Sequence, residues 1–181
     1  MKNILKSSLK VLGDYFVSLI IFVIFLYTFF VITKDNYSKW IPLYSGINFI
    51  LMASIMYTDM KNLGKKEKRP QYNLSPHPLK GFVLGIIGFL PVIILEIVYT
   101  FLNFNNEVNN RIAELALKVI LGPVYIFVRL VGGTTAGYIL ASLAVPVVTA
   151  LGYMAGYYGF EFRKKIGAKA ANNKASDKIA K

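Results

Sequence analysis

One acidic residue stands out because of where it lies. Glu96 is the single acid in an apolar run from Gly81 to Leu102. A carboxylate well inside a membrane helix costs about 2.5–3.5 kcal/mol on insertion scales, so such a group usually has a partner or a role. Two interpretations stay open. Glu96 binds a proton or a cation, or it is structural, at the headgroup edge or in an ion pair with Arg129 or Lys118.

The spacing of small residues indicates which way Glu96 points. Gly85 lies eleven positions before Glu96, close to three helical turns, so the two share one helix face. Small residues let two helices approach closely, and Glu96 is therefore predicted to face other helices and not lipid. A second glycine series occurs in the last apolar run, where packing within one bundle and packing between two copies are both open. The predicted helix-packing residues are Gly81, Gly85, Gly88, Gly152 and Gly156.

The composition excludes most catalytic and metal-binding chemistry. The chain has no cysteine, and its one histidine, His77, lies between Pro76 and Pro78 in a polar segment. Thiol nucleophiles, iron–sulfur clusters and histidine metal clusters are therefore excluded. No phosphate-binding loop or nucleophile elbow occurs. We expect no metal, no cofactor and no enzymatic activity.

Four apolar runs must position these residues. The chain has 181 residues, of which 55% are hydrophobic and 17% are charged. Apolar runs of about 18 or more residues are typical of membrane-spanning helices, so the sequence predicts an all-α integral membrane protein. Kinks are expected at Pro91 and Pro146. Asn48 is expected to form a hydrogen bond across helices, and a role in helix packing is favoured over contact with a ligand. The predicted spans are approximately 15–33, 40–58, 81–102 and 136–159.

The segment 107–131 is ambiguous. Three charged residues share one face of its first half, which predicts an amphipathic helix: Arg111, Glu114 and Lys118. Its second half has ten apolar residues interrupted by Gly122-Pro123, too few to cross a hydrocarbon core of about 30 Å. We expect an outer-side helix that lies flat at the interface or re-enters the bilayer with Gly122-Pro123 as its turning point. Of the two, the sequence favours the flat arrangement.

Lysine and arginine predict the topology. Three basic residues precede the first apolar run, six lie between positions 61 and 80, and seven follow Glu161, which makes 16 of 21. Basic residues of short loops stay in the cytoplasm. Four crossings place all three groups on one side, whereas a fifth would leave the tail outside. We therefore predict a cell-membrane protein with both termini cytoplasmic, a bundle over 1–160 and a disordered basic tail over 161–181.

The same basic groups indicate a partner. Residues 59–80 contain three prolines and are predicted to be a solvated loop. Lysine and arginine near a membrane each contribute about 1 kcal/mol of attraction to anionic headgroups. No element that recognises nucleic acid accompanies the net charge of +12, so the predicted partner is the lipid bilayer. The predicted headgroup contacts are Lys65, Lys66, Lys68, Arg69, Arg163, Lys164 and Lys165.

Two stretches resemble known proteins. They read Pro78-Leu-Lys-Gly-Phe-Val-Leu-Gly-Ile-Ile-Gly-Phe-Leu-Pro91 and Gly152-Tyr-Met-Ala-Gly-Tyr-Tyr-Gly-Phe160. Both are similar to stretches of uncharacterised small multipass membrane proteins of low-GC Gram-positive bacteria. The resemblance implies a bacterial cytoplasmic membrane and supplies no catalytic residues.

Two functions follow from these features as hypotheses. The first is a non-enzymatic membrane subunit or scaffold that packs against itself or against a larger partner, because the chain is small and has small-residue faces. The second is a small transporter or channel, with Glu96 as an intramembrane coupling site and Pro91 and Pro146 as mobile points. An enzyme is the least supported class, since no convergent catalytic groups occur.

Overall fold

The computed structural model describes residues 2–69, 76–101 and 106–160. Every regular element in these ranges is a helix, and four helices are long and apolar enough to cross a membrane. This confirms the predicted all-α class and supports a multi-pass membrane protein. The basic tail, 161–181, lies outside the described residues. The elements are α1 (Lys2–Thr33), η1 (Lys34–Asn36), α2 (Tyr37–Glu67), α3 (Lys80–Phe101), α4 (Glu107–Ile120), η3 (Gly122–Val124), α5 (Tyr125–Leu130) and α6 (Thr135–Tyr158).

Helices α1 and α2 extend well beyond the predicted spans 15–33 and 40–58. They contain 32 and 31 residues, which corresponds to roughly 48 and 46 Å, compared with a hydrocarbon core of about 30 Å. Hydropathy detects only the part of a helix that suits lipid. The loop predicted from Asp59 to Lys80 is therefore wrong in its first part, because α2 continues through Glu67 and no proline occurs between Thr58 and Pro70.

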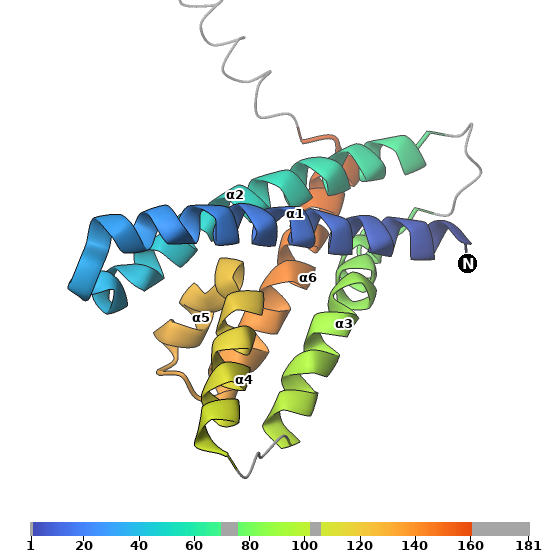
Figure 1. Cartoon of the computed structure of the whole chain (residues 1–181). Coiled ribbons are helices and arrows are strands. Elements are labelled where there is room, and N and C mark those ends of the chain that lie inside the picture. The colour runs from blue at the N-terminus through green and yellow to red at the C-terminus, as the bar shows by residue number, and fades with distance from the viewer. Residues whose placement is uncertain (1, 70–75, 102–105, 161–181) are drawn as a thin grey trace, which may run out of the picture.

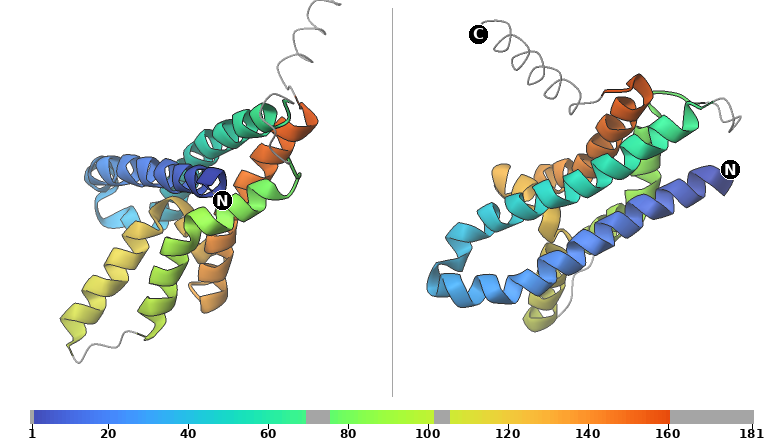
Figure 2. Two further views of the ribbon diagram at one scale, coloured as in Figure 1. Left: turned by 90° about the vertical axis from the view of Figure 1, so that its right-hand side faces the viewer. Right: turned by 90° about the horizontal axis from the view of Figure 1, so that it is seen from above.

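The helices form two groups that cross. Helices α1 and α2 run antiparallel and side by side, and α3 and α6 cross them at a steep angle (Figures 1 and 2). The most extensive packing joins α6 to α2 and to α3. In contrast, only 11% of the most apolar window of α1 is buried within the chain. Most of α1 is thus available to lipid or to a partner.

Four helix ends meet at one end of the molecule, namely the start of α1, the end of α2, the start of α3 and the end of α6 (Figure 1). Lys10 Nζ pairs with Asp59 Oδ2 at 2.9 Å and joins α1 to α2. Lys68 Nζ donates a hydrogen bond to the Tyr157 carbonyl oxygen at 2.9 Å and joins the end of α2 to α6. The basic residues at positions 2–10, 61–69 and 80 belong to these ends. The start of α1 and the end of α6 lie at the same end (Figure 1), which agrees with an even number of crossings.

The segment 107–131 is a broken helix and not one continuous element. Helix α4 ends at Ile120, the turn η3 follows at Gly122-Pro123-Val124, and α5 leads away from it. Gly122, Pro123 and Val124 are all buried. The break therefore lies inside the bundle, against α1 and α2.

Side chains from α1 and α2 satisfy the backbone at this break. The Ser45 hydroxyl donates to the Gly122 carbonyl oxygen at 2.7 Å and accepts a hydrogen bond from the Ile126 amide at 2.9 Å. The Tyr15 hydroxyl donates to the Ile120 carbonyl oxygen at 2.7 Å. Buried backbone groups need such partners when a helix is interrupted, so residues far apart in sequence hold the turn in place.

The predicted glycines lie where helices approach most closely. A Cβ at Gly85 would lie 2.6 Å from Pro146 Cα on α6, and one at Gly152 would lie 2.7 Å from the Tyr57 carbonyl oxygen on α2. No real side chain tolerates these separations from backbone atoms. The other three glycines also lie against neighbouring helices: Gly81 against α6, Gly88 against α1 and Gly156 against α2. All five therefore serve helix packing within a single chain.

Candidate functional site

Glu96 and Ser142 meet between α3 and α6. The two helices run antiparallel (Figure 1), and both residues lie within about two turns of the same end, where α3 finishes and α6 begins. The Ser142 hydroxyl donates a hydrogen bond to Glu96 Oε2. Glu96 is 9% exposed and Ser142 is 7% exposed. The carboxylate predicted to face other helices is thus directed into the bundle.

A cavity of about 730 Å³ adjoins this pair. Its polar groups are one carboxylate, the serine hydroxyl and two tyrosines, and the rest of the wall is mainly aliphatic. Glu96 is the only aspartate or glutamate among the described lining residues, and no lysine or arginine is among them. The lining residues are Ile93, Glu96, Ile97, Tyr99, Leu117, Gly133, Tyr138, Ile139, Ser142 and Leu143.

Neither predicted cationic partner of Glu96 lines the cavity. Lys118 instead forms an ion pair with Glu114, one turn earlier on α4. The hydrogen bond that Lys118 Nζ donates to Glu114 Oε1 is the main reason why the pKa of Lys118 is raised. Arg129 is exposed in the last turn of α5. The hydroxyl of Ser142 contacts Glu96 Oε2.

The two prolines lie about one turn from the cavity. Pro91 precedes Glu96 by five positions, and Pro146 follows Ser142 by four. Because proline has no backbone N–H, Pro146 cannot donate the usual helical hydrogen bond to the Ser142 carbonyl. The helix is therefore weakened beside the serine that contacts Glu96. Thr149 lies one turn further along and donates to the Pro146 carbonyl oxygen at 2.9 Å.

Asn48 lies in a different place from this pair. Its side chain is buried on α2, and Nδ2 donates to the Tyr44 carbonyl oxygen one turn earlier at 2.9 Å. This contact lies within its own helix and not across helices. The structure does not bring Asn48 together with Glu96, since Asn48 is not among the residues that line the cavity.

A second buried carboxylate, Glu67, was not singled out from the sequence. Glu67 is 3% exposed at the end of α2. Its Oε2 accepts a hydrogen bond from the Tyr153 hydroxyl at 2.6 Å and pairs with Lys80 Nζ at 2.7 Å. The three residues come from α2, α6 and the start of α3. This cluster joins three helices at the basic end and compensates the buried charge.

The basic residues at the end of α2 lie beside this cluster. Lys68 and Arg69 are exposed, and Lys66 is also exposed, while Lys65 is partly buried. The predicted headgroup contacts Arg163, Lys164 and Lys165 lie outside the described residues. Within the described ranges, no group of three His, Asp or Glu residues is placed to hold a metal ion.

Comparison with known proteins leaves this geometry as the basis for function. No family model, curated protein or solved structure matches the chain. The similarity to uncharacterised small multipass proteins of Gram-positive bacteria remains a prediction. The features of the chain that bear on its function are the cavity at Glu96, the packing of the helices and the charges at their ends.

Proposed function

We propose that the chain is a non-enzymatic multi-pass membrane transporter that binds a lipophilic organic cation at Glu96. One observation carries the proposal. A buried carboxylate with a hydroxyl partner adjoins a cavity of about 730 Å³ whose other described lining residues are apolar or aromatic. Cavities of roughly 300–1,000 Å³ are typical of small-molecule sites.

The wall chemistry supports a cation that also has apolar surface. A carboxylate in a medium of low dielectric attracts a positive charge far more strongly than it does in water. The faces of Tyr99 and Tyr138 provide cation–π contacts. The aliphatic residues favour a greasy ligand over a hydrated metal ion. An anionic ligand is disfavoured because it would face Glu96 without a compensating cation among the lining residues.

The orientation of the chain in the membrane belongs to the same proposal. The end where α1 begins and α6 finishes carries the basic residues at positions 2–10, 61–69 and 80, and the sequence after Glu161 is basic as well. These charges favour a cytoplasmic location for that end and for both termini, in the cell membrane. Glu96 and Ser142 lie toward the other ends of α3 and α6. The cavity is then open from the outer side, and a substrate reaches it from there or from the outer leaflet.

We further propose that α4, η3 and α5 form a re-entrant hairpin from the outer side. The support is the buried turn at Gly122 and Pro123, whose freed backbone groups have partners from Ser45 and Tyr15. Irregular backbone at membrane depth is tolerated where protein satisfies it. This departs from the flat interfacial helix that the sequence favoured. The hairpin supplies one cavity residue, Leu117.

Binding of tetraphenylphosphonium to the purified chain tests the proposal. We expect saturable binding in detergent, weakened at least about thirty-fold in Glu96→Gln, because loss of one partner of a desolvated charge pair typically costs 2 kcal/mol or more. Glu114→Gln is the matched control, since Glu114 pairs with Lys118 outside the cavity wall, and it should bind normally. Equal affinity of the wild type and Glu96→Gln, with both folded, would contradict the proposal.

A membrane subunit or scaffold remains the second candidate. One observation favours it, namely that α1 is apolar yet only 11% of its most apolar window is buried by the chain. The small-residue faces that first suggested this function are used inside the chain, so α1 is the face available for a partner. We expect one membrane protein to copurify reproducibly with the chain, and we expect polar substitutions on the exposed face of α1 to abolish this. That result would favour a subunit or scaffold over a transporter.

A further inference from the structure

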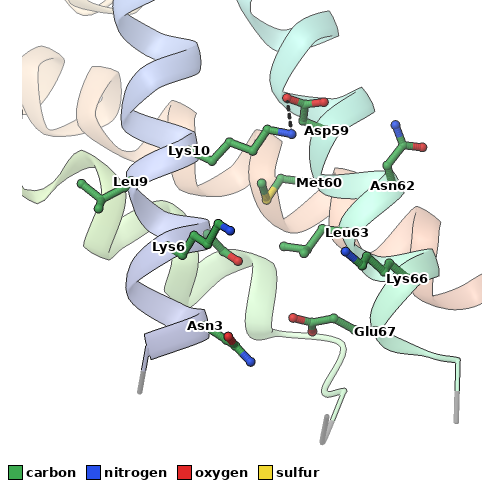
Figure 3. A pocket seen from close by; sticks show the side chains of 11 residues that line it. Asn3, Lys6, Leu9, Lys10, Asp59, Met60, Asn62, Leu63, Lys66 and Glu67 are labelled. Atoms are coloured by element: carbon green, nitrogen blue, oxygen red, sulfur yellow. Dashed lines mark ion pairs between the residues drawn. The ribbon is translucent and has the colours of Figure 1, made fainter. Parts of the chain in front are cut away.

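A groove lies between the first turns of α1 and the last turns of α2. Its volume is about 700 Å³, and Figure 3 shows its side chains. It is at the basic end of the molecule, whereas Glu96 lies near the opposite end of α3. The lining residues are Asn3, Lys6, Ser7, Leu9, Lys10, Asp59, Met60, Asn62, Leu63, Lys66 and Glu67.

Lysines from both helices face the groove. Lys6 reaches from α1 and Lys66 from α2 toward the space between the helices (Figure 3). The two carboxylates of the lining each have a cation of their own. Asp59 pairs with Lys10 across the groove at 2.9 Å. Glu67 pairs with Lys80 behind it at 2.7 Å, so the groove as a whole has an excess of positive charge.

Apart from the charged residues, most of the groove lining is apolar or carries side-chain amides. Leu63 and Met60 extend from α2 toward α1 and form its apolar part, whereas the Leu9 side chain points away from α2 (Figure 3). Asn3 and Asn62 supply amides. Asp14 lies one turn deeper along α1 than Lys10 and does not line the groove. A ligand that fits must therefore combine an anionic, hydrogen-bonding head with an apolar portion.

The position of the groove along the helices restricts the ligand further. Its α1 residues precede the apolar run that begins near position 15, and its α2 residues follow the run that ends near 58. These positions correspond to headgroup depth when the apolar runs occupy the hydrocarbon core. At that depth, the anionic amphipathic molecules at high concentration are phospholipids.

We propose that this groove is a specific site for one anionic phospholipid. Lys6 and Lys66 bind the phosphate, with the Lys10–Asp59 pair beside it, and an acyl chain lies along Leu63 and Met60. The site differs from general attraction of the basic loops to the bilayer because it lies in a defined cavity between two helices. It does not depend on what binds at Glu96.

Native mass spectrometry of the purified full-length chain measures this binding directly. We expect one molecule of palmitoyl-oleoyl phosphatidylglycerol to bind more tightly than the phosphatidylcholine with the same acyl chains. The double variant Lys6→Gln, Lys66→Gln should weaken phosphatidylglycerol binding by about thirty-fold, given the usual contribution of each lysine near a membrane surface. Binding of phosphatidylcholine should not change.

A matched control has the same loss of charge at the opposite end of the α1–α2 hairpin. Lys34→Gln, Lys39→Gln removes two exposed lysines there and should leave phosphatidylglycerol binding within about two-fold of the wild type. Equal binding of the two lipids, or equal weakening in both double variants, would overturn the proposal. Displacement of the lipid by excess inorganic phosphate alone would also overturn it, in favour of a site for free phosphate. The melting temperature of each variant reports that it is folded.

Discussion

At the scale of single residues, two buried carboxylates have different surroundings. Glu67 contacts a lysine and a tyrosine, so its negative charge is balanced inside the protein. Glu96 contacts the Ser142 hydroxyl beside a cavity that lacks lysine and arginine among its described lining residues. The first arrangement stabilises a junction between helices, and the second suits an exchangeable positive ligand.

The junction at Glu67 predicts a loss of stability when its tyrosine hydroxyl is removed. Tyr153→Phe deletes the 2.6 Å hydrogen bond to Glu67 and keeps the buried ring. Hydrogen bonds to charged groups contribute about 1.5–3 kcal/mol, so we expect a clearly lower melting temperature in detergent. Tyr158→Phe, at an exposed position, should melt within about a degree of the wild type. Indistinguishable melting of both variants and the wild type would show that the Glu67 contact contributes nothing.

Much of the Glu96 site followed from the sequence, but its partner did not. Glycine spacing correctly turned Glu96 toward other helices. Lys118 and Arg129 were considered because opposite charges attract, although the spacing of four between Glu114 and Lys118 already favours an ion pair on one helix face. Ser142 was detectable in principle, since it lies seven positions after the start of α6 and Glu96 lies five before the end of α3. Matching depths in neighbouring antiparallel helices would have brought them together.

At the scale of the elements, close helix crossings determine the packing. Helix α6 approaches α3 at Gly85 and α2 at Gly152 so closely that a side chain would meet backbone. Apolar surface gains little from burial when the alternative environment is lipid, so van der Waals contact at small residues supplies much of the association. The crossings explain why α6 is the most buried of the four long apolar helices, with 44% of its window inside the chain.

Two glycine substitutions should therefore act in opposite directions. Gly156→Ala places a methyl group 2.9 Å from the carbonyl carbon of Lys61, and overpacking of this kind costs about 1–3 kcal/mol. Gly13→Ala on α1 meets nothing within 4 Å and gains about 0.5–1 kcal/mol of helix stability. Thermal unfolding in detergent should rank Gly13→Ala above the wild type and Gly156→Ala below it. The reverse order would contradict the assigned helix crossing.

The sequence predicted these elements unequally well. Spans 81–102 and 136–159 match α3 and α6 to within a residue at each end, because Pro78 and Gly159 lie next to their ends. Helices α1 and α2 exceed their predicted spans, since polar residues continue a helix as readily as apolar ones. The broken hairpin at Gly122 depends on Ser45 and Tyr15, which lie more than 70 positions earlier. No local pattern contains that information.

At the scale of the whole molecule, the chain separates two kinds of site. Lysine-rich helix ends and the lipid groove lie at one end, and the Glu96 cavity lies toward the other ends of α3 and α6. In the proposed topology, the first is cytoplasmic and the second is open to the outside. The entry of a substrate from the outer side therefore depends on which face of the membrane each end occupies.

Thiol labelling in intact cells measures this directly, because the chain has no cysteine of its own. We predict that a membrane-impermeant maleimide labels Ile139→Cys, in the cavity wall, without permeabilisation and that tetraphenylphosphonium slows the labelling. Asn62→Cys, in the groove at the basic end, should be labelled only after permeabilisation. Labelling of Asn62→Cys from outside, or of Ile139→Cys only from inside, would contradict the orientation and the outward-open cavity.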